Sequence, residues 1–387
     1  MLIIKNNPGE KVKNPFYLKP LPLAASFCNR EKEIEDLVRH AKNCTNVVLS
    51  SPRRFGKTSL VKRVQKILKK KNVEIIYIDF FGVASIEEVA SKLAAGIYSI
   101  VYKEENLLKK TLKFFLSLRP VIKPDPETGI SMTMEVIRGK NGPELLEETM
   151  KGLSDFLAAS RKKYNVAIDE FQEITELKES LSIEGIMRTY IQHQQNVSYF
   201  FIGSRRRILS DIFNNKKRAF YKSAINYSLP ALPSDATVKY IIDMFKRYGK
   251  SCSKDIAKKI YEVTKGYPYY LQKLSYYIFD IIKHVVRNKE LHQGIMELLN
   301  EETMIFEVML QNLKPGQISF LYALAKEPII TPFNIDYLTR HRLGSIGGIQ
   351  SAIKKLVSLD YIEKTPSGWK VIDPIFALWL RKKEIIE

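Results

Sequence analysis

The sequence predicts an α/β protein whose parallel sheet is followed by a helical segment and then by a small domain with a β-hairpin. Three features support this prediction. Short apolar runs alternate with amphipathic helical patterns over the first 234 residues, which is typical of βαβ units. Residues 235–312 show helical periodicity with almost no strand pattern. Residues 313–387 combine three short helical patterns with two β-rich runs around a turn at residues 366–368.

The elements of the core follow in order. Residues 1–26 are expected to form an irregular arm, because prolines at positions 8, 15, 20 and 22 prevent a long helix. Core residues 27–234 are expected to contain five strands, at 46–50, 73–80, 166–168, 197–202 and 224–229. The expected helices begin near residue 31 and then cover residues 57–70, 85–118, 143–162 and 182–194. Residues 119–138 carry three prolines and a glycine between alternating β-forming residues, which predicts an inserted hairpin.

Charge and cysteine content narrow the class of protein. The 387 residues include 62 Lys and Arg against 42 Asp and Glu, a net charge of +20. This surplus favours a polyanionic partner, nucleic acid before an acidic membrane surface, and a generally basic proteome is the alternative. Three cysteines without a CxxC pair argue against a structural zinc site or disulfide framework. The start lacks a signal-peptide pattern and no run of 18 apolar residues occurs, so we expect a cytoplasmic protein with no membrane association.

A loop between an expected strand and an expected helix carries the central motif. Residues 51–58, SPRRFGKT, match the phosphate-binding pattern GxxxxGK[ST] except that Ser51 replaces the first glycine. Gly56 would let backbone N–H groups approach phosphate oxygens, Lys57 would contact the β and γ phosphates, and Thr58 would bind Mg²⁺. The other loop residues expected around the phosphates are Pro52, Arg53, Arg54 and Phe55. The alternative is an ordinary basic loop before a helix.

Two carboxylates follow the third expected strand. Asp169 and Glu170 come directly after an apolar run, and charge at the end of a buried strand needs a reason. A nucleotide-bound Mg²⁺ gives one: Asp169 would hold the metal through its water shell, and Glu170 would act as general base towards the attacking water. Solvated acids at a strand end are the alternative.

Two further candidates lie after the fourth strand. Ser204 is placed to contact the γ-phosphate or the attacking water, although a turn residue is the alternative. Arg218 belongs to a group of arginines before the fifth strand and is a candidate to act in trans on a neighbour's nucleotide, as an arginine finger. A solvated basic face is the alternative for each of these arginines.

Several segments resemble one known family. FCNREKEI at residues 27–34 resembles the F-x-G-R-x-x-E-[IL] box of archaeal-type ATPases in the STAND and AAA+-related group, with Asn29 in place of the glycine. SPRRFGKTSL, AIDEFQEI, FIGSRRRIL and KGYPYYLQ resemble that group's P-loop, Walker B segment, sensor-1 strand and the G-x-P motif of its helical lid. The resemblance extends from about residue 25 over almost the whole chain.

The resemblance implies a P-loop NTPase core with a five-stranded parallel sheet of order 5-1-4-3-2 and an all-α lid over residues 235–312. It implies that adenine lies between residues 27–30 and the lid. It adds four residues to the expected nucleotide site: Asn29, Arg30, Ser59 and Pro268. No sensor-2 arginine stands near residues 266–268, which favours the STAND-like branch over an unfoldase or a replication initiator.

The last 75 residues have the pattern of a winged helix, with helices expected at 317–326, 334–341 and 347–359 before the hairpin. The candidate recognition helix has four polar or basic positions, Gln350, Ser351, Lys354 and Lys355. Three further candidates lie just before it: Tyr337, Arg340 and Arg342. These groups suit contacts with phosphates and base edges. The ending GWKVIDPIFALW resembles the end of the same archaeal ATPases, in which the winged helix often serves protein contacts or autoinhibition.

Together these features predict an ATPase that uses ATP and Mg²⁺, turns over slowly, and acts as a switch. The γ-phosphate would hold lid and winged helix in one arrangement, and double-stranded DNA would bind the winged helix. Beside DNA, the candidate partners are a second copy of the chain, in a homo-oligomer, and another protein. Three alternatives stay open: a DNA-remodelling or mobile-element ATPase that oligomerises on DNA, a non-hydrolysing nucleotide-binding scaffold, and a DNA-binding regulator with a vestigial P-loop.

Overall fold

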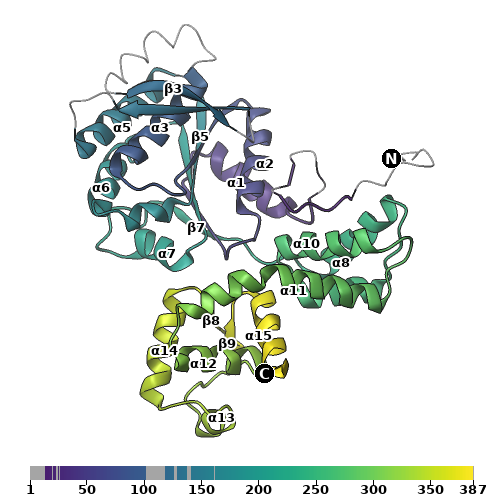
Figure 1. Cartoon of the computed structure of the whole chain (residues 1–387). Helices are drawn as coiled ribbons and strands as arrows, with labels where there is room; N and C mark the ends of the chain where they lie inside the picture. The colour runs from purple at the N-terminus through teal and green to yellow at the C-terminus, as the bar shows by residue number, and fades with distance from the viewer. Residues whose placement is uncertain are drawn as a thin grey trace. The chain divides into compact units, whose positions relative to one another are not determined.

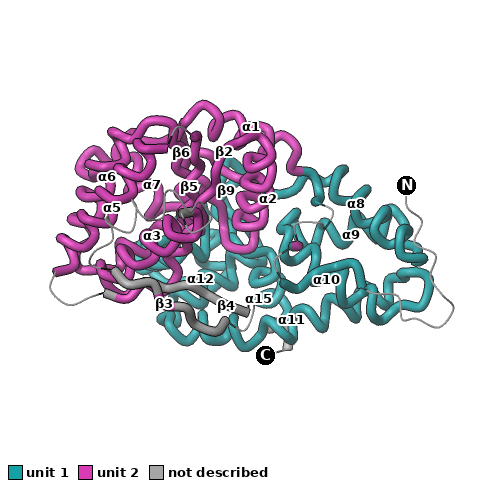
Figure 2. Tube along the Cα trace, turned by 90° about the horizontal axis from the view of Figure 1, so that it is seen from above, with its two compact units in different colours: residues 1–21, 25–29, 231–387 teal, residues 22–24, 30–230 magenta. Residues whose placement is uncertain are grey.

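The computed structural model describes residues 14–19, 21–22, 25, 27–101, 118–125, 129–136, 141–160 and 162–386. These residues belong to two compact units, coloured separately in Figure 2. The first unit, drawn in magenta and marked unit 2 in Figure 2, consists of residues 30–230 with residue 22. The second unit, drawn in teal and marked unit 1 there, consists of residues 231–386 with the remaining described residues before 30. Within the described residues, none of the helices combines the length and the apolar character needed to cross a membrane.

The first unit contains a five-stranded parallel sheet in the order β2-β5-β6-β1-β7. Its strands are β1 (Val47–Ser50), β2 (Val73–Asp79), β5 (Lys163–Asp169), β6 (Val197–Gly203) and β7 (Ile225–Ser228). Counted along the chain and read from the β7 edge, this order is 5-1-4-3-2. Every residue of β6 is buried, as a central parallel strand requires. Because all five strands are parallel, their carboxyl ends meet at one edge of the sheet.

Helices cover both faces of this sheet (Figure 1). On one face lie α1 (Glu31–Lys42) and α2 (Lys57–Lys69); on the other lie α3 (Ile86–Val101), α5 (Gly142–Ala159) and α6 (Ser180–Ile191). Beyond them, α7 (Arg206–Asn214) packs against β1. The second face buries four phenylalanine rings whose centroids lie 4.7 to 5.8 Å apart: Phe171, Phe201, Phe213 and Phe220.

The inserted hairpin is confirmed. Strand β3 (Leu118–Asp125) pairs antiparallel with β4 (Gly129–Val136) over their full lengths. The helix predicted over residues 85–118 is confirmed at 86–101 but wrong at Leu118, which already belongs to β3. Residues 102–117 of that prediction lie outside the described residues.

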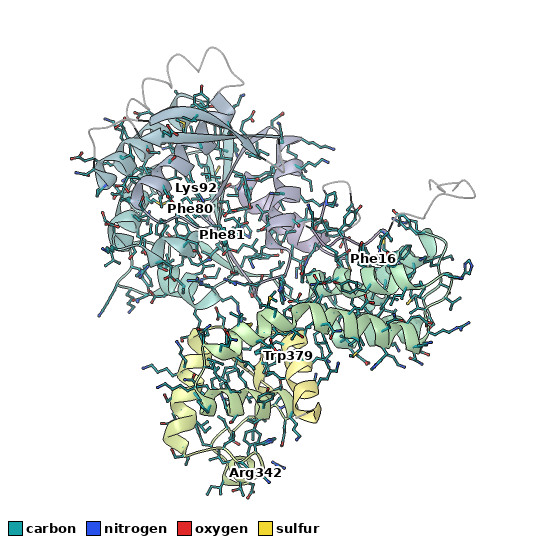
Figure 3. All side chains as sticks on the ribbon, in the orientation of Figure 1. Phe16, Phe80, Phe81, Lys92, Arg342 and Trp379 are labelled. Atoms are coloured by element: carbon teal, nitrogen blue, oxygen red, sulfur yellow. The ribbon has the colours of Figure 1, made fainter. Side chains whose placement is uncertain are left out.

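The second unit begins with four helices, α8 (Ser234–Arg247), α9 (Lys254–Thr264), α10 (Pro268–Ile281) and α11 (Asn288–Gln311). The described part of the N-terminal arm contains neither helix nor strand and packs on these helices. The ring of Phe16 lies 5.2 Å from that of Phe245 and 6.1 Å from that of Phe279, centroid to centroid (Figure 3). The remaining arm residues lie outside the description.

The unit ends in the helices and hairpin of the predicted winged helix: α12 (Pro315–Lys326), α13 (Ile335–Arg340), α14 (Ile346–Ser358), β8 (Ile362–Thr365) and β9 (Gly368–Val371). A final helix, α15 (Pro374–Ile386), was not expected from the sequence. Its Trp379, labelled in Figure 3, donates an indole N–H to Thr303 Oγ1 of α11 at 3.0 Å. The new helix therefore joins the winged helix to the four-helix segment.

Candidate functional site

The loop between β1 and α2 has two left-handed residues, Arg54 (φ 71°) and Gly56 (φ 77°). Glycine adopts this conformation without strain, and no atom outside its chain neighbours lies within 4 Å of where a Cβ on Gly56 would stand. The first turn of α2 is thus open beside residue 56. Ser51 is fully buried and is not among the described residues with a positive φ, so serine can replace the glycine of the motif without backbone strain.

Lys57 lies at the start of α2 with only 6 % of its surface exposed. Its ammonium donates to the carbonyl oxygens of Ser51 at 3.0 Å and Pro52 at 3.1 Å. Burial lowers the pKa of Lys57 to about 8, although the carboxylates of Glu170 and Asp169 act in the opposite direction. An ammonium held by loop carbonyls in this way is a cation that a phosphate group could attract from its present partners.

Asp169, at the end of β5, meets the start of α2. The hydroxyl groups of Thr58 and Tyr77 both donate to its Oδ2, at 2.7 Å and 2.5 Å. Burial, reinforced by the charge of Asp169, raises the pKa of Tyr77, so the phenol remains a donor. In the described residues, no group of three His, Cys, Asp or Glu side chains could hold a metal alone. Thr58 and Asp169 fit Mg²⁺, which favours one or two protein oxygens together with substrate phosphates.

Glu170 follows in the left-handed conformation, with φ at 49°. Its Oε2 accepts hydrogen bonds from Ser204 Oγ, at 3.3 Å, and from the side-chain amide of Gln172. Ser204 stands just after β6, so the carboxyl ends of β5 and β6 bring together two residues that the sequence suggested separately. The structure thus assembles Lys57, Asp169, Glu170 and Ser204 at one edge of the sheet.

Three side chains at this edge were missed by the sequence analysis: Tyr77, Asp79 and Gln172. Asp79 ends β2 in direct register with Asp169 of β5, and partial burial raises its pKa, with the charge of Asp169 acting in the same direction. The reasoning applied to Asp169, an acid closing an apolar strand, would have found it. Tyr77 and Gln172 carry no comparable signal, because ordinary strand and turn positions explain both residue types.

The other residues predicted in and near the loop differ in how far they are exposed. Phe55 is buried, Arg54 and Ser59 are half-buried, and Arg53 is exposed. The guanidinium of Arg30 is buried and bonds Glu33 at 2.7 Å and the carbonyl of Pro230 at 2.8 Å, which ties the start of α1 to the segment after β7. Its contact with a nucleotide stays a prediction.

Asn29 and Pro268 belong to the second unit. Asn29 has φ at 40°, a left-handed conformation that asparagine tolerates better than most residues, which explains why it can replace the glycine of the motif. Pro268 is the first residue of α10, where its missing N–H leaves no hydrogen bond unmade. Their roles in nucleotide binding stay predictions.

Arg218 is occupied within its own chain. Its guanidinium forms an ion pair with the fully buried carboxylate of Glu184 and lies 3.4 Å from Asp211. Moving this arginine to another subunit would leave Glu184 buried without its partner, which is unfavourable. A structural ion pair accounts for Arg218 as the structure has it, and its action in trans stays a prediction.

Comparison with known proteins agrees with this geometry. A family described as an ATPase domain predominantly from Archaea matches residues 27–274, and a probable winged helix domain matches residues 304–382. The Walker-type ATPase PABY2304 of Pyrococcus abyssi has 19% identity and a TM-score of 0.70, covering 95% of this chain and 99% of that one. No curated protein matches the chain.

Two proteins of Aeropyrum pernix are similar in fold. The Aeropyrum pernix ORC2 protein, solved as ADPNP–ADP complexes, has 15% identity and a TM-score of 0.55 over 93% of this chain and 96% of that one. The Aeropyrum pernix ORC1 protein, solved in complex with DNA, has 15% identity and a TM-score of 0.51 over 95% and 96%. At these identities the likeness concerns the fold.

We expect binding of a triphosphate to weaken as the pH rises above about 8, the pKa of Lys57. Below this pH Lys57 is already charged; above it, binding must take up a proton, and affinity falls by up to about tenfold per pH unit. Calorimetric titration with ATPγS in two buffers of different ionisation enthalpy measures this uptake. Lys57→Arg stays charged throughout and serves as the control, so equal uptake in that variant would assign the proton elsewhere.

Proposed function

The chain belongs to the family of ATPase domains found predominantly in Archaea, and on that premise we propose that it is a Mg²⁺-dependent ATP-hydrolysing switch acting on its winged helix and on DNA. The observation that carries the proposal is the meeting of Lys57, Asp169 and Glu170 at the carboxyl edge of the sheet. Turnover by the isolated chain is expected to be slow, because Arg218 is already paired with Glu184 and the catalytic arginine would have to come from a partner.

Each group has a defined role in this proposal. Lys57 neutralises charge on the β and γ phosphates, and Thr58 and Asp169 would hold Mg²⁺, which supplies further neutralisation of phosphate charge when bound. Glu170 accepts a proton from the attacking water while the oxygen of that water bonds to the γ-phosphorus. The bond from that phosphorus to the bridging oxygen breaks, and ADP leaves with the electron pair.

Contacts inside the second unit support coupling to the winged helix. The hydroxyl of Tyr267 donates to the carbonyl of Ile372 at 2.6 Å, and that of Tyr270 donates to the carboxylate of Asp373 at 2.5 Å. Both tyrosines belong to the KGYPYYLQ segment that resembles a lid motif, and both acceptors connect β9 to α15. A displacement of the lid motif would therefore be passed directly to the winged helix.

Helix α14 supports DNA as the ligand of the winged helix. Gln350, Ser351, Lys354 and Lys355 are all exposed, while five apolar residues of the same helix are buried: Ile349, Ala352, Ile353, Leu356 and Val357. Of the three candidates before α14, Arg340 and Arg342 are exposed, but Tyr337 is fully buried and its hydroxyl bonds the carbonyl of Glu327, so it is not available to DNA. The solved complex of the Aeropyrum pernix ORC1 protein with DNA gives a precedent in a related fold.

The surplus of basic residues is not concentrated in the winged helix. Residues 313–387 contain 11 basic and 7 acidic residues, whereas residues 27–234 contain 35 and 24. Most of the surplus is thus carried by the ATPase core. The face of α14, rather than the net charge of the winged helix, is the feature that favours DNA.

Steady-state hydrolysis tests the function directly. We expect slow ATP turnover that needs Mg²⁺ and rises on titration with duplex DNA, and a loss of at least about 100-fold in Glu170→Gln because the general base is removed. ATP affinity should survive in that variant. Equal turnover in both proteins would refute the role of Glu170, and tight binding without any hydrolysis would favour a nucleotide-binding scaffold.

The double variant Lys354→Ala/Lys355→Ala tests the DNA face. If both ammonium groups contact phosphates, the slope of log affinity against log salt becomes shallower by about 2. Fluorescence anisotropy with labelled duplex DNA at several salt concentrations measures the slope. An unchanged slope would move the DNA contact away from α14, and a matched change of Lys258 and Lys259 on α9 to alanine is the control.

Tyr270→Phe tests the coupling. The variant loses only the hydroxyl that bonds Asp373, so basal turnover is expected to stay as in the wild type while stimulation by DNA falls several-fold. Parallel hydrolysis assays with and without duplex DNA give both quantities. Tyr277→Phe removes a hydroxyl from the same helix and should keep the stimulation; an identical loss in both variants would argue against this route.

A further inference from the structure

We propose that Gln172 positions the carboxylate of Glu170 for hydrolysis, an inference that rests on the proposed ATPase function. Gln172 is the second residue of the 3-10 helix η2 (Phe171–Glu176) and is 1 % exposed. Its side-chain amide nitrogen donates to Glu170 Oε2 and lies 3.5 Å from Glu173 Oε1. No step of the reaction uses Gln172, yet its amide is buried directly against the general base.

The backbone of Glu170 explains why such support is needed. A non-glycine residue with φ at 49° is unfavourable and persists only where surrounding contacts hold it. The carbonyl of Glu170 accepts the N–H of Glu173 at 2.9 Å, which begins η2, and its carboxylate accepts from Gln172 and Ser204. The main chain and the side chain of Glu170 are therefore both held, and the side chain is held by two buried donors, Gln172 and Ser204.

The two donors leave one oxygen for chemistry. Gln172 and Ser204 both donate to Oε2, and within the described part of the chain no donor meets Oε1. A carboxylate held at one oxygen presents the other in a fixed direction, which is what a general base needs towards an attacking water.

The other end of the amide shows that this arrangement has a cost. Gln172 Oε1 is buried and makes no hydrogen bond to any described residue. Turning the amide over would place that oxygen against the Glu170 carboxylate, where the two would repel each other. The nitrogen must therefore face Glu170, and an unpaired buried oxygen is the consequence.

Gly203, the last residue of β6, provides the space. A Cβ on this residue would stand 1.8 Å from Gln172 Oε1 and 2.9 Å from a methyl group of Leu209. The first distance is too short for any side chain at position 203 while Gln172 keeps its position. Only glycine here allows the amide to reach Glu170. The end of β6 therefore leaves the space that the side chain of Gln172 in η2 occupies.

The test uses Gln172→Leu, which keeps the volume and removes the amide. We expect kcat to fall by about 10- to 100-fold through misplacement of Glu170, while the affinity for a fluorescent ATP analogue changes by less than about twofold. Gln65→Leu is the control, because it removes another buried glutamine, and the amide of that glutamine bonds the carbonyl of Ile76 and the side chain of Asn165, neither of which has a role in the proposed reaction. It is expected to lower the melting temperature and to leave kcat unchanged.

Gly203→Ala gives a second, independent route to the same result. In the wild-type background the added methyl group should displace Gln172 and lower kcat by a similar factor. In a Gln172→Ala background the clash with residue 172 is gone, so Gly203→Ala should change kcat by less than about twofold further. Equal losses from Gly203→Ala in both backgrounds would overturn the inference.

The outcomes separate this inference from the function beneath it. If Glu170→Gln abolishes turnover and Gln172→Leu retains or increases it, the positioning role is wrong and the ATPase stands. If wild type and Glu170→Gln are equally inactive, the proposed function falls and the inference falls with it. A loss of kcat in Gln172→Leu with unchanged nucleotide affinity, and no such loss in Gln65→Leu, establishes the role.

Discussion

The first unit depends on holding a buried ammonium and a buried carboxylate together at the carboxyl edge of its sheet, beside the half-buried carboxylate of Glu170. Lys57 and Asp169 are 6 % and 4 % exposed, and neither would be favourable there alone. Their opposite charges support each other, and the loop carbonyls and two hydroxyl groups satisfy the remaining bonding capacity. The positive charge of Lys57 is therefore in place before a phosphate binds, and the phosphate needs only to replace the carbonyl oxygens around it.

A buried pair of opposite charges also stabilises the second unit. Lys273 of α10 and Glu302 of α11 are almost completely buried and form an ion pair at 2.7 Å, with Glu301 3.0 Å from the same ammonium. The neighbouring Thr303 accepts the indole N–H of Trp379. The helix that carries the lid tyrosines is thus joined to α11, and α11 to α15, by polar contacts that tolerate little displacement. Contacts of this kind favour movement of these helices as one body, which is what the proposed switch requires.

The two departures from the family pattern illustrate what a motif glycine is for. Asn29 takes a left-handed φ of 40°, so the backbone requirement persists and asparagine meets it. Ser51 needs no positive φ, and the left-handed turns of the phosphate loop fall at Arg54 and Gly56 instead. Gly56, beside the first turn of α2, combines the positive φ with open space for an anion. The pattern is therefore flexible where neither close approach nor a left-handed backbone is required.

The same reasoning separates what the sequence could predict from what it could not. Strands, the phosphate loop and the acidic pair were predictable because apolar runs and motif spacing are local, and Asp79 could have been found by extending the rule used for Asp169. Helix α15 was not predicted, because the ending GWKVIDPIFALW was interpreted only as a resemblance to the family. Tyr77 reaches Asp169 only through the register of β2 with β5. Gln172 reaches Glu170 only because residue 170 is left-handed and residue 203 has no side chain. Contacts between elements that are distant in the sequence determine such positions. A single sequence contains the contacting residues, but it has no local pattern that shows which of them meet.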